Sequence, residues 1–166
     1  MLRAPEAKPE PEPVKVTFSR EWLDAQPEPE GGPEMRCLAE ALYFEARGES
    51  VKGQFAVAEV IMNRVKSERY PGSVCGVITQ GTGKKYQCQF TYTCDGLKET
   101  IREPRAFERA TKIARLVLDG ALPRLTGGAT HYHTRKVNPR WSRVFTKTAA
   151  IGDHIFYRAG IRTASN

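Results

Sequence analysis

The chain has 166 residues, of which 40% are hydrophobic and 27% charged, so it is large and apolar enough to form one domain with its own core. Nothing in it resembles a transmembrane span, and the N-terminus lacks the apolar run of a secretory signal. The net charge of +7 is concentrated late in the chain, because residues 1–34 hold 4 basic and 8 acidic side chains and the remainder holds 22 and 11. A cationic surface favours polyanionic partners such as bacterial wall polymers, nucleic acid or anionic lipids, although it equally serves solubility.

The first 33 residues hold 7 of the 11 prolines, alternating with glutamate. This composition predicts a disordered or extended tether over residues 1–33. The stretch from Phe18 to Leu23 is the exception, since Ser19 can cap a short helix that docks on the rest of the protein.

A first long helix is predicted from Pro33 to about Arg47, with Gly48 ending it. Glu45 continues the apolar stripe of this helix at positions i, i+3, i+4 and i+7. The other members of the stripe are Leu38, Ala41 and Leu42. Lost hydration and the negative end of the helix should raise the pKa of Glu45, as a general acid for glycoside cleavage requires. The alternative is a glutamate at the stripe edge that reaches water or pairs with Arg47 or another arginine.

A second helix is predicted from Val51, with Ser50 as its cap, and must end before Pro71. Glu49 lies at its positive end, where the ionised carboxylate is favoured. Gln54 lies one turn further on, and its amide can bind a sugar hydroxyl or N-acetyl group, or simply be solvated.

Helical periodicity disappears between Pro71 and Gly96, a loop-rich stretch with three of the four cysteines. The cysteines are Cys37, Cys75, Cys88 and Cys94. Their spacing does not match zinc knuckles and favours two disulfides in an oxidising compartment, with three pairings open. Four buried free thiols are the alternative.

A third helix is predicted from about Pro104 to Gly120. After the Gly127–Gly128 pair, residues 129–134 and 151–157 alternate like strands, separated by a region around Trp141. The expected fold class is therefore α+β, mainly helical with a small C-terminal β element.

All three histidines fall in these predicted strands. His131 and His133 share a face, and His154 from a neighbouring strand could complete a zinc site, with Glu45 as general base. An H-x-H pair on a strand is a weak signal for metal, because histidines in a polar cleft also bind substrate or fill space.

Aromatic residues interleave with these polar groups, which suits a sugar cleft because pyranose rings stack on aromatic faces. They are Phe90, Tyr92, Tyr132, Trp141, Phe156 and Tyr157. The same rings could instead form core, or bind single-stranded nucleic acid together with arginines.

Five runs occur in a fixed order over residues 35–158: LAEALYFEARGESVKGQFAVAEVIMNRV, YPGSVCGVITQ, CQFTYTCDG, TGGATHYH and IGDHIFYR. They resemble the spore cortex-lytic cell wall hydrolase family, in the form found in Gram-negative bacteria. The resemblance implies a lysozyme-like α+β catalytic domain that cleaves peptidoglycan glycan strands between N-acetylmuramic acid and N-acetylglucosamine. It also implies that no cofactor or metal is needed, and that the product is that of a lytic transglycosylase or a muramidase.

The resemblance assigns the catalytic role to Glu45, the first glutamate of EARGE. It implies a set of substrate-binding residues, to which His131 is added from the strand that carries Tyr132. The set is Gln54, Phe90, Gly127, Gly128, Tyr132, His131 and His154. The family pattern also favours the pairings Cys37–Cys94 and Cys75–Cys88, in a loop where the spore enzymes lack these cysteines.

The predicted organisation is a tether over residues 1–33, a catalytic domain over 34–160 and a flexible tail over 161–166. The protein is expected to be a monomer in the periplasm or elsewhere outside the cytoplasm, with peptidoglycan rather than nucleic acid as partner. Asp95 and Asp153 are the available second carboxylates, and a lone acid favours transglycosylation over hydrolysis. The competing functions are a zinc hydrolase using the three histidines and a non-catalytic wall-binding or nucleic-acid-binding module.

Overall fold

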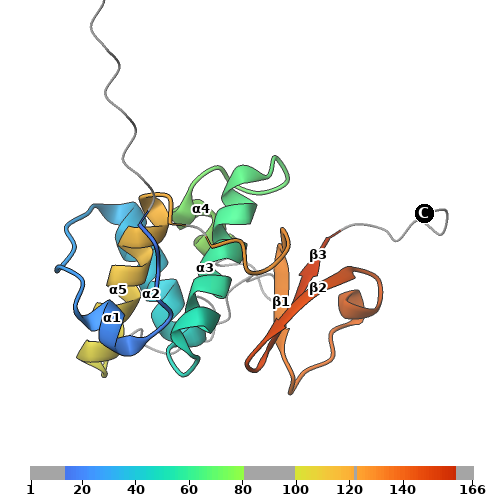
Figure 1. The fold of residues 1–166 in the computed structure, drawn as a ribbon. Helices are drawn as coiled ribbons and strands as arrows, with labels where there is room; N and C mark the ends of the chain where they lie inside the picture. The colour runs from blue at the N-terminus through green and yellow to red at the C-terminus, as the bar shows by residue number, and fades with distance from the viewer. Residues whose placement is uncertain (1–13, 81–99, 122, 160–166) are drawn as a thin grey trace, which may run out of the picture.

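A computed structural model describes residues 14–80, 100–121 and 123–159. Within these ranges a layer of helices packs beside a small sheet, with α3 between the other helices and the sheet (Figure 1). The helices are α1 (Arg20–Asp24), α2 (Pro33–Ala46), α3 (Val51–Lys66), α4 (Val74–Thr79), α5 (Pro104–Leu118) and the 3-10 helix η2 (Arg140–Arg143). The strands are β1 (His131–Thr134), β2 (Thr146–Ile151) and β3 (His154–Arg158), in the antiparallel order β1-β3-β2. The predicted α+β class, mainly helical with a small C-terminal sheet, is confirmed.

The predicted helix starts are confirmed for the two helices that flank the EARGE run. Pro33 occupies the first turn of α2, and the Ser50 hydroxyl accepts a hydrogen bond from the Gly53 amide at 3.1 Å at the start of α3. The end of α2 differs in detail, because Gly48 does not adopt the left-handed conformation of a glycine cap. The chain instead turns through a bond from the Glu49 amide to the Ala46 carbonyl at 2.9 Å.

The main core lies between α2, α3 and α5, whose inward faces are fully buried. Its largest fully buried side chains on these helices include Leu38, Leu42, Tyr43, Phe55 and Ile113. This core fixes the end of α2, and therefore the position of Glu45, relative to α3. No helix among the described residues is both long and apolar enough to cross a membrane.

The short helix predicted before residue 33 is also confirmed. Ser19 caps α1 by accepting from the Trp22 amide at 3.1 Å, and Leu23 is fully buried. Lys112 of α5 donates to the Asp24 carbonyl at 3.0 Å. Around α1, part of the segment predicted as a tether thus packs on the helical layer, while Val14 is exposed.

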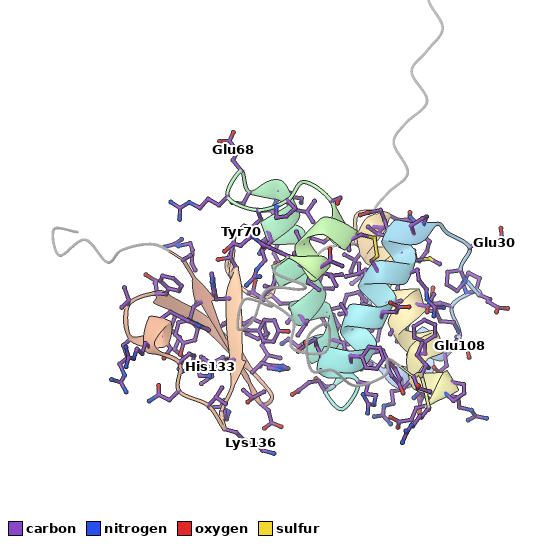
Figure 2. All side chains as sticks on the ribbon, turned by 180° about the vertical axis from the view of Figure 1, so that it is seen from behind. Glu30, Glu68, Tyr70, Glu108, His133 and Lys136 are labelled. Carbon is purple, nitrogen blue, oxygen red and sulfur yellow. A yellow bond between two sulfur atoms is a disulfide. The ribbon has the colours of Figure 1, made fainter. Side chains whose placement is uncertain are left out.

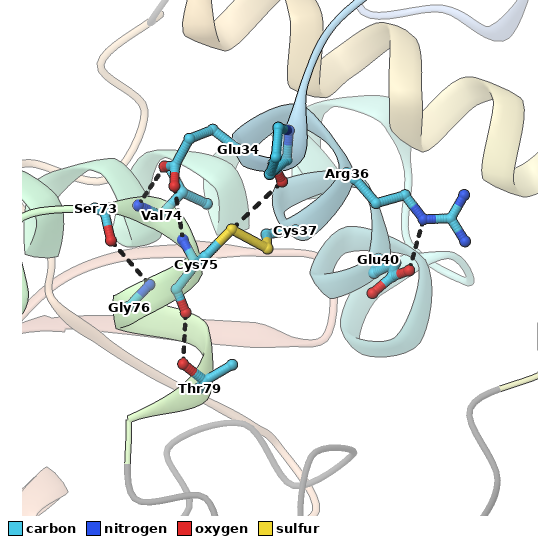
Figure 3. Close-up of a disulfide and its surroundings, with 10 residues drawn as sticks. Glu34, Arg36, Cys37, Glu40, Ser73, Val74, Cys75, Gly76 and Thr79 are labelled. Carbon is cyan, nitrogen blue, oxygen red and sulfur yellow. Dashed lines mark hydrogen bonds and ion pairs between the residues drawn. A yellow bond between two sulfur atoms is a disulfide. The ribbon is translucent and has the colours of Figure 1, made fainter.

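The predicted disulfide pairing is wrong, because Cys37 of α2 is bonded to Cys75 of α4 (Figure 3). Helix α4 was not predicted, since six residues are too few to show a helical period. Glu34 accepts from the Val74 amide at 2.6 Å and so holds the start of α4 against α2, which brings Cys75 beside Cys37. The partners proposed for these two cysteines, Cys94 and Cys88, lie outside the described residues, as do Phe90 and Asp95.

The sheet contains one strand more than predicted. The predicted strands correspond to β1 and β3, and β2 pairs with the other edge of β3 through a register shift between Lys147 and Ala149. This irregularity interrupts the alternation by which a strand is recognised. Gly152, with φ of +58°, makes the tight turn from β2 to β3.

Strand register divides the side chains of β1 and β3 between two faces. Tyr132 is opposite Phe156, and Thr134 is opposite His154, so these four share a face. This inner face packs on Ala56 and Val60 of α3. His131 and His133 point to the outer face.

Candidate active site

A cavity of about 250 Å³ opens where the end of α2 meets β1 and the β2–β3 turn. It is lined by Glu45, Ala46, Gly48, Glu49, Thr134, Arg135, Lys136, Asp153 and His154. In Figure 2, His133 lies within the sheet layer and Lys136 extends from the edge of that layer. The cavity combines three carboxyl groups with two exposed cations and a buried histidine.

Glu45 is half-buried in the last turn of α2. The Tyr132 hydroxyl donates to its Oε2 at 3.4 Å, and its Oε1 is shielded from solvent. The alternative in which Arg47 neutralises Glu45 is wrong, because Arg47 Nε donates to Glu103 Oε2 at 2.5 Å. The helix end thus presents a partly desolvated carboxyl group to the cavity.

Tyr132 is oriented by the inner face of the sheet. Its ring meets the His154 ring edge to face at 5.0 Å between centroids, and the Phe156 ring lies 6.0 Å away. Because both neighbours are buried, the hydroxyl that reaches Glu45 comes from a packed ring.

Glu49 lies beside Glu45 in the same cavity, although sequence reasoning placed it only at the start of α3. Its Oε1 is 3.5 Å from His154 Nδ1, and its side chain is 14% exposed. A side chain at Gly152 would bring a Cβ within 2.6 Å of Glu49 Oε2, and one at Gly53 would lie 3.2 Å from the Glu49 Cβ. Two glycines therefore form the slot that receives this carboxylate.

The surroundings of His154 lower its pKa from the ordinary value. Burial lowers its pKa, while the charges of Glu49 and Asp153 act in the opposite direction and His133 adds a smaller lowering effect. The contact with Glu49 is within ion-pair distance, but Nδ1 makes no hydrogen bond there. We regard it as a polar contact of a neutral imidazole, because desolvation is the largest influence on the ring.

The zinc site considered from the sequence is wrong, because the three histidines do not converge. His133 bonds the Tyr157 hydroxyl through Nε2 at 2.9 Å and the Thr134 carbonyl through Nδ1 at 2.7 Å, on the face opposite His154. His131 contacts the Thr130 hydroxyl through Nδ1 at 3.0 Å. Within the described ranges, no three histidine, cysteine, aspartate or glutamate side chains are grouped to hold a metal ion.

The outer-face histidines belong to an aromatic cluster instead. Ring centroids of Trp141 and His131 are 5.1 Å apart, and those of Trp141 and His133 are 5.6 Å apart. Burial lowers the pKa of His131 to about 4, with a smaller contribution from Arg64. His131 therefore lies away from the cavity that contains Glu45.

The remaining predicted residues fall in two places. Gln54 is buried, and its amide donates to the Glu49 carbonyl at 3.2 Å, so it supports the turn before α3. Gly127 and Gly128, both with positive φ, line a second cavity of about 600 Å³ with Glu59, Asn63, Lys66, Gly120 and Arg124. The structure thus brings together Glu45, Tyr132 and His154, adds Glu49, and places the glycine pair in a separate cavity.

The sequence does not predict that Glu49 lies in the same cavity as Glu45, because a break between two helices separates the two residues. Glu45 and Glu49 are four residues apart, but Gly48 separates two helices, so helical spacing does not predict that they meet. Gly152, which accommodates Glu49, lies 103 residues later.

The curated relatives are spore cortex-lytic enzymes. The enzyme of Halalkalibacterium halodurans is 38% identical over 126 residues, which is 74% of this chain and 34% of that enzyme. The enzyme of Bacillus cereus is 35% identical over 124 residues, which is 74% of this chain and 43% of that enzyme. The chain therefore spans less than half the length of these relatives.

Solved structures similar to this chain are catalytic domains. The catalytic domain of the germination-specific lytic transglycosylase SleB from Bacillus anthracis has a TM-score of 0.60 and 31% identity, covering 80% of this chain and 100% of that one. The catalytic domain of the Bacillus cereus SleB protein has a TM-score of 0.57 and 32% identity, covering 78% of this chain and 94% of that one.

The model of the cell wall hydrolase family matches residues 48–157. This span contains Glu49, Tyr132 and His154 and begins three residues after Glu45. It covers well over half of the chain, which therefore belongs to the cell wall hydrolase family.

Proposed function

We propose that this protein is a lytic transglycosylase that cleaves peptidoglycan glycan strands between N-acetylmuramic acid and N-acetylglucosamine, with Glu45 as its acid. The observation that carries the proposal is a partly buried carboxyl group on the cavity wall, touched by the Tyr132 hydroxyl at 3.4 Å. Membership of the cell wall hydrolase family and similarity to a lytic transglycosylase catalytic domain support it.

In the first step, protonated Glu45 donates its proton to the glycosidic oxygen, and the bond from that oxygen to C1 of the muramoyl residue breaks. The electron pair leaves with the N-acetylglucosamine oxygen. In the second step, the Glu45 carboxylate takes the proton of the muramoyl C6 hydroxyl, and the C6 oxygen bonds to C1. The product is a 1,6-anhydro ring, no water is consumed, and Glu45 regains its proton.

Hydrolysis is the competing outcome, because Glu49 and Asp153 also line the cavity. A second carboxylate that activated water would add that water to C1 and give a reducing end. The nature of the product therefore distinguishes the two chemistries.

We assign substrate contact first to Tyr132 and His154, which lie beside the acid. The exposed cations Arg135 and Lys136 border the same cavity and suit the carboxylates of peptide stems. Gly127 and Gly128 would then contact a more distant part of the strand, and Gln54 would act by supporting Glu49. Phe90 and His131 are proposed as substrate contacts from the sequence alone, and His131 would make its contact on the outer face of the sheet, outside the cavity that contains Glu45.

An oxidising compartment outside the cytoplasm fits the Cys37–Cys75 disulfide. The catalytic unit is proposed to span residues 34–160 as a monomer.

The deciding experiment is a digest of purified peptidoglycan analysed by mass spectrometry. Wild-type protein should release fragments with anhydro ends, and Glu45→Gln should release them at least about a hundredfold more slowly. The matched control is Glu40→Gln, a half-buried glutamate of the same helix that pairs with Arg36 at 2.6 Å, which should digest normally. Fragments that carry added water would show that the activity is that of a muramidase rather than a lytic transglycosylase. Full activity of Glu45→Gln would show that Glu45 is not the catalytic acid. Binding without any product would leave a non-catalytic module.

A further inference from the structure

We infer that Glu49 is a positioning residue for the proposed reaction, whose carboxylate acts through Glu45 by favouring its protonated form. The inference rests on the proposed function, since it concerns the proton that Glu45 delivers. It gives a role to the second glutamate of EARGE that neither the periodicity of α2 nor that of α3 indicates.

The carboxylate of Glu49 is fixed in place by the backbone around it. Gly53 of α3 and Gly152 of the β2–β3 turn leave room for it, and a Cβ at Gly152 would lie only 2.6 Å from Oε2. Gln54 donates to the Glu49 carbonyl at 3.2 Å and holds the turn between the helices. Because the side chain is 14% exposed, its charge is poorly screened by water.

Several features leave the charge of the Glu49 carboxylate available to its neighbours. It directly precedes the Ser50 cap, where the positive end of α3 favours a carboxylate. Burial lowers the pKa of His154, 3.5 Å away, which favours the neutral imidazole over a cation that would cancel that charge. The lining cations Arg135 and Lys136 are exposed, so solvent and salt weaken their influence.

The consequence for Glu45 follows from its neighbours in the cavity. A negative charge at Glu49 disfavours a second negative charge at Glu45, and the resulting preference is for the acid that carries a proton. Asp153 acts in the same direction but is exposed, and the Tyr132 hydroxyl, which donates to Glu45, acts in the opposite direction. Among the described residues that line the cavity, Glu49 is therefore the less exposed carboxylate that offsets the hydrogen bond from Tyr132.

The test is the pH profile of dye release from labelled peptidoglycan. Replacement of Glu49 by glutamine should move the alkaline limb of the profile to lower pH by about one unit, which is about a tenfold loss at a fixed pH above the limb. Activity should return as the pH is lowered. Glu49→Asp keeps the charge on a shorter side chain and should shift the limb less. Glu40→Gln, which removes a carboxylate of α2 that pairs with Arg36 and does not line the cavity, should leave the limb in place.

Gly152→Ala provides an independent variant, because it keeps every charge and displaces the Glu49 carboxylate from its slot. It should shift the limb in the same direction as Glu49→Gln, and it tests the inference if Glu49→Gln fails to fold. An unchanged limb in both variants, or a loss of activity that is uniform across pH, would overturn the inference. The Glu45→Gln variant separates this inference from the proposed function. If Glu45→Gln loses its activity but the limb does not shift in the Glu49 and Gly152 variants, the proposed function stands and only the role of Glu49 fails. If Glu45→Gln keeps its activity, the proposed function itself fails.

Discussion

On the face of the sheet that packs against α3, Tyr132 and His154 contact carboxylates contributed by the helical layer. On the opposite face, His131 and His133 contact aromatic rings around η2 and the neighbouring turn. Both faces bury imidazole rings, but only the inner face brings them to a cavity with acidic groups. Neighbouring residues of one strand thus belong either to the cavity or to the aromatic cluster, because successive side chains point to opposite faces of the sheet.

The comparison shows why three histidines in adjacent strands do not make a metal site here. His133 and His154 lie on facing strands, but their register puts Ile155 opposite His133 and Thr134 opposite His154. A shift of one residue would reverse this assignment. The predictions below test whether the inner face serves catalysis and the outer face serves stability.

The largest effect is expected for the acid that the inner face contacts. Loss of the proton donor in Glu45→Gln should lower kcat by about 10²–10⁴-fold with little change in the unfolding midpoint. Kinetics on soluble glycan fragments and thermal unfolding measure the two quantities. The outer-face variant His133→Gln should show the reverse pattern, with altered stability and retained activity.

The next effect is on the stability of the outer face. Trp141→Ala removes a half-buried ring that contacts His131, His133 and Tyr157, with centroid distances of 5.1, 5.6 and 5.2 Å. We expect a loss of about 2 kcal/mol in the free energy of unfolding, since the ring is only partly buried. Chemical denaturation measures it. A fall in kcat of the folded variant would show that the two faces are coupled.

A smaller effect is expected for the hydroxyl that joins the sheet to Glu45. Tyr132→Phe keeps the ring against His154 and removes the hydroxyl that donates to Glu45 Oε2. Because one hydrogen bond is worth about 1 kcal/mol, kcat should change by about fivefold or less. Tyr157→Phe is the matched control, since it removes the hydroxyl that contacts His133 on the outer face. Equal effects of the two variants would contradict the separation of the faces.

The smallest effect is a dependence of stability on pH from His131. Its pKa is lowered to about 4 in the folded state from an ordinary value of 6.5, so the unfolded state binds the proton more readily. Stability from this group is therefore present above pH 6.5 and is lost as the pH falls toward 4. Partial exposure reduces the expected loss to roughly 1 kcal/mol. His131→Gln should flatten this part of the stability curve, and an unchanged slope would assign the dependence to other groups.

The helices could be predicted where the sequence carries both a period and a start signal. Pro33 and Ser50 mark the starts of α2 and α3, and Glu45 was found because it continues an apolar stripe. Helix α4 is too short to show a period, and β2 contains a register shift. The sequence therefore predicts helices whose residues follow a regular period. It does not predict short or irregular elements such as α4 and β2, which lack such a period.

The same distinction holds for the site. The place of Glu45 follows from local periodicity, and the assignment of Tyr132 follows from its motif. Glu49 enters the cavity only because Gly152, on a distant turn, has no side chain. The predicted disulfide pairing was wrong for a related reason. Glu34 positions Cys75 by accepting hydrogen bonds from backbone amides, and such bonds have no signature in the sequence.

Glu34 accepts from the Val74 amide at 2.6 Å and from the Cys75 amide at 3.5 Å. These bonds do not depend on the oxidation state of sulfur, so they can align the two thiols while both are still reduced. The first turn of α2 would then serve as a template for oxidation, and the nascent chain would favour this partner over the two cysteines further along. A carboxylate in the first turn of α2 would thereby favour formation of the Cys37–Cys75 disulfide.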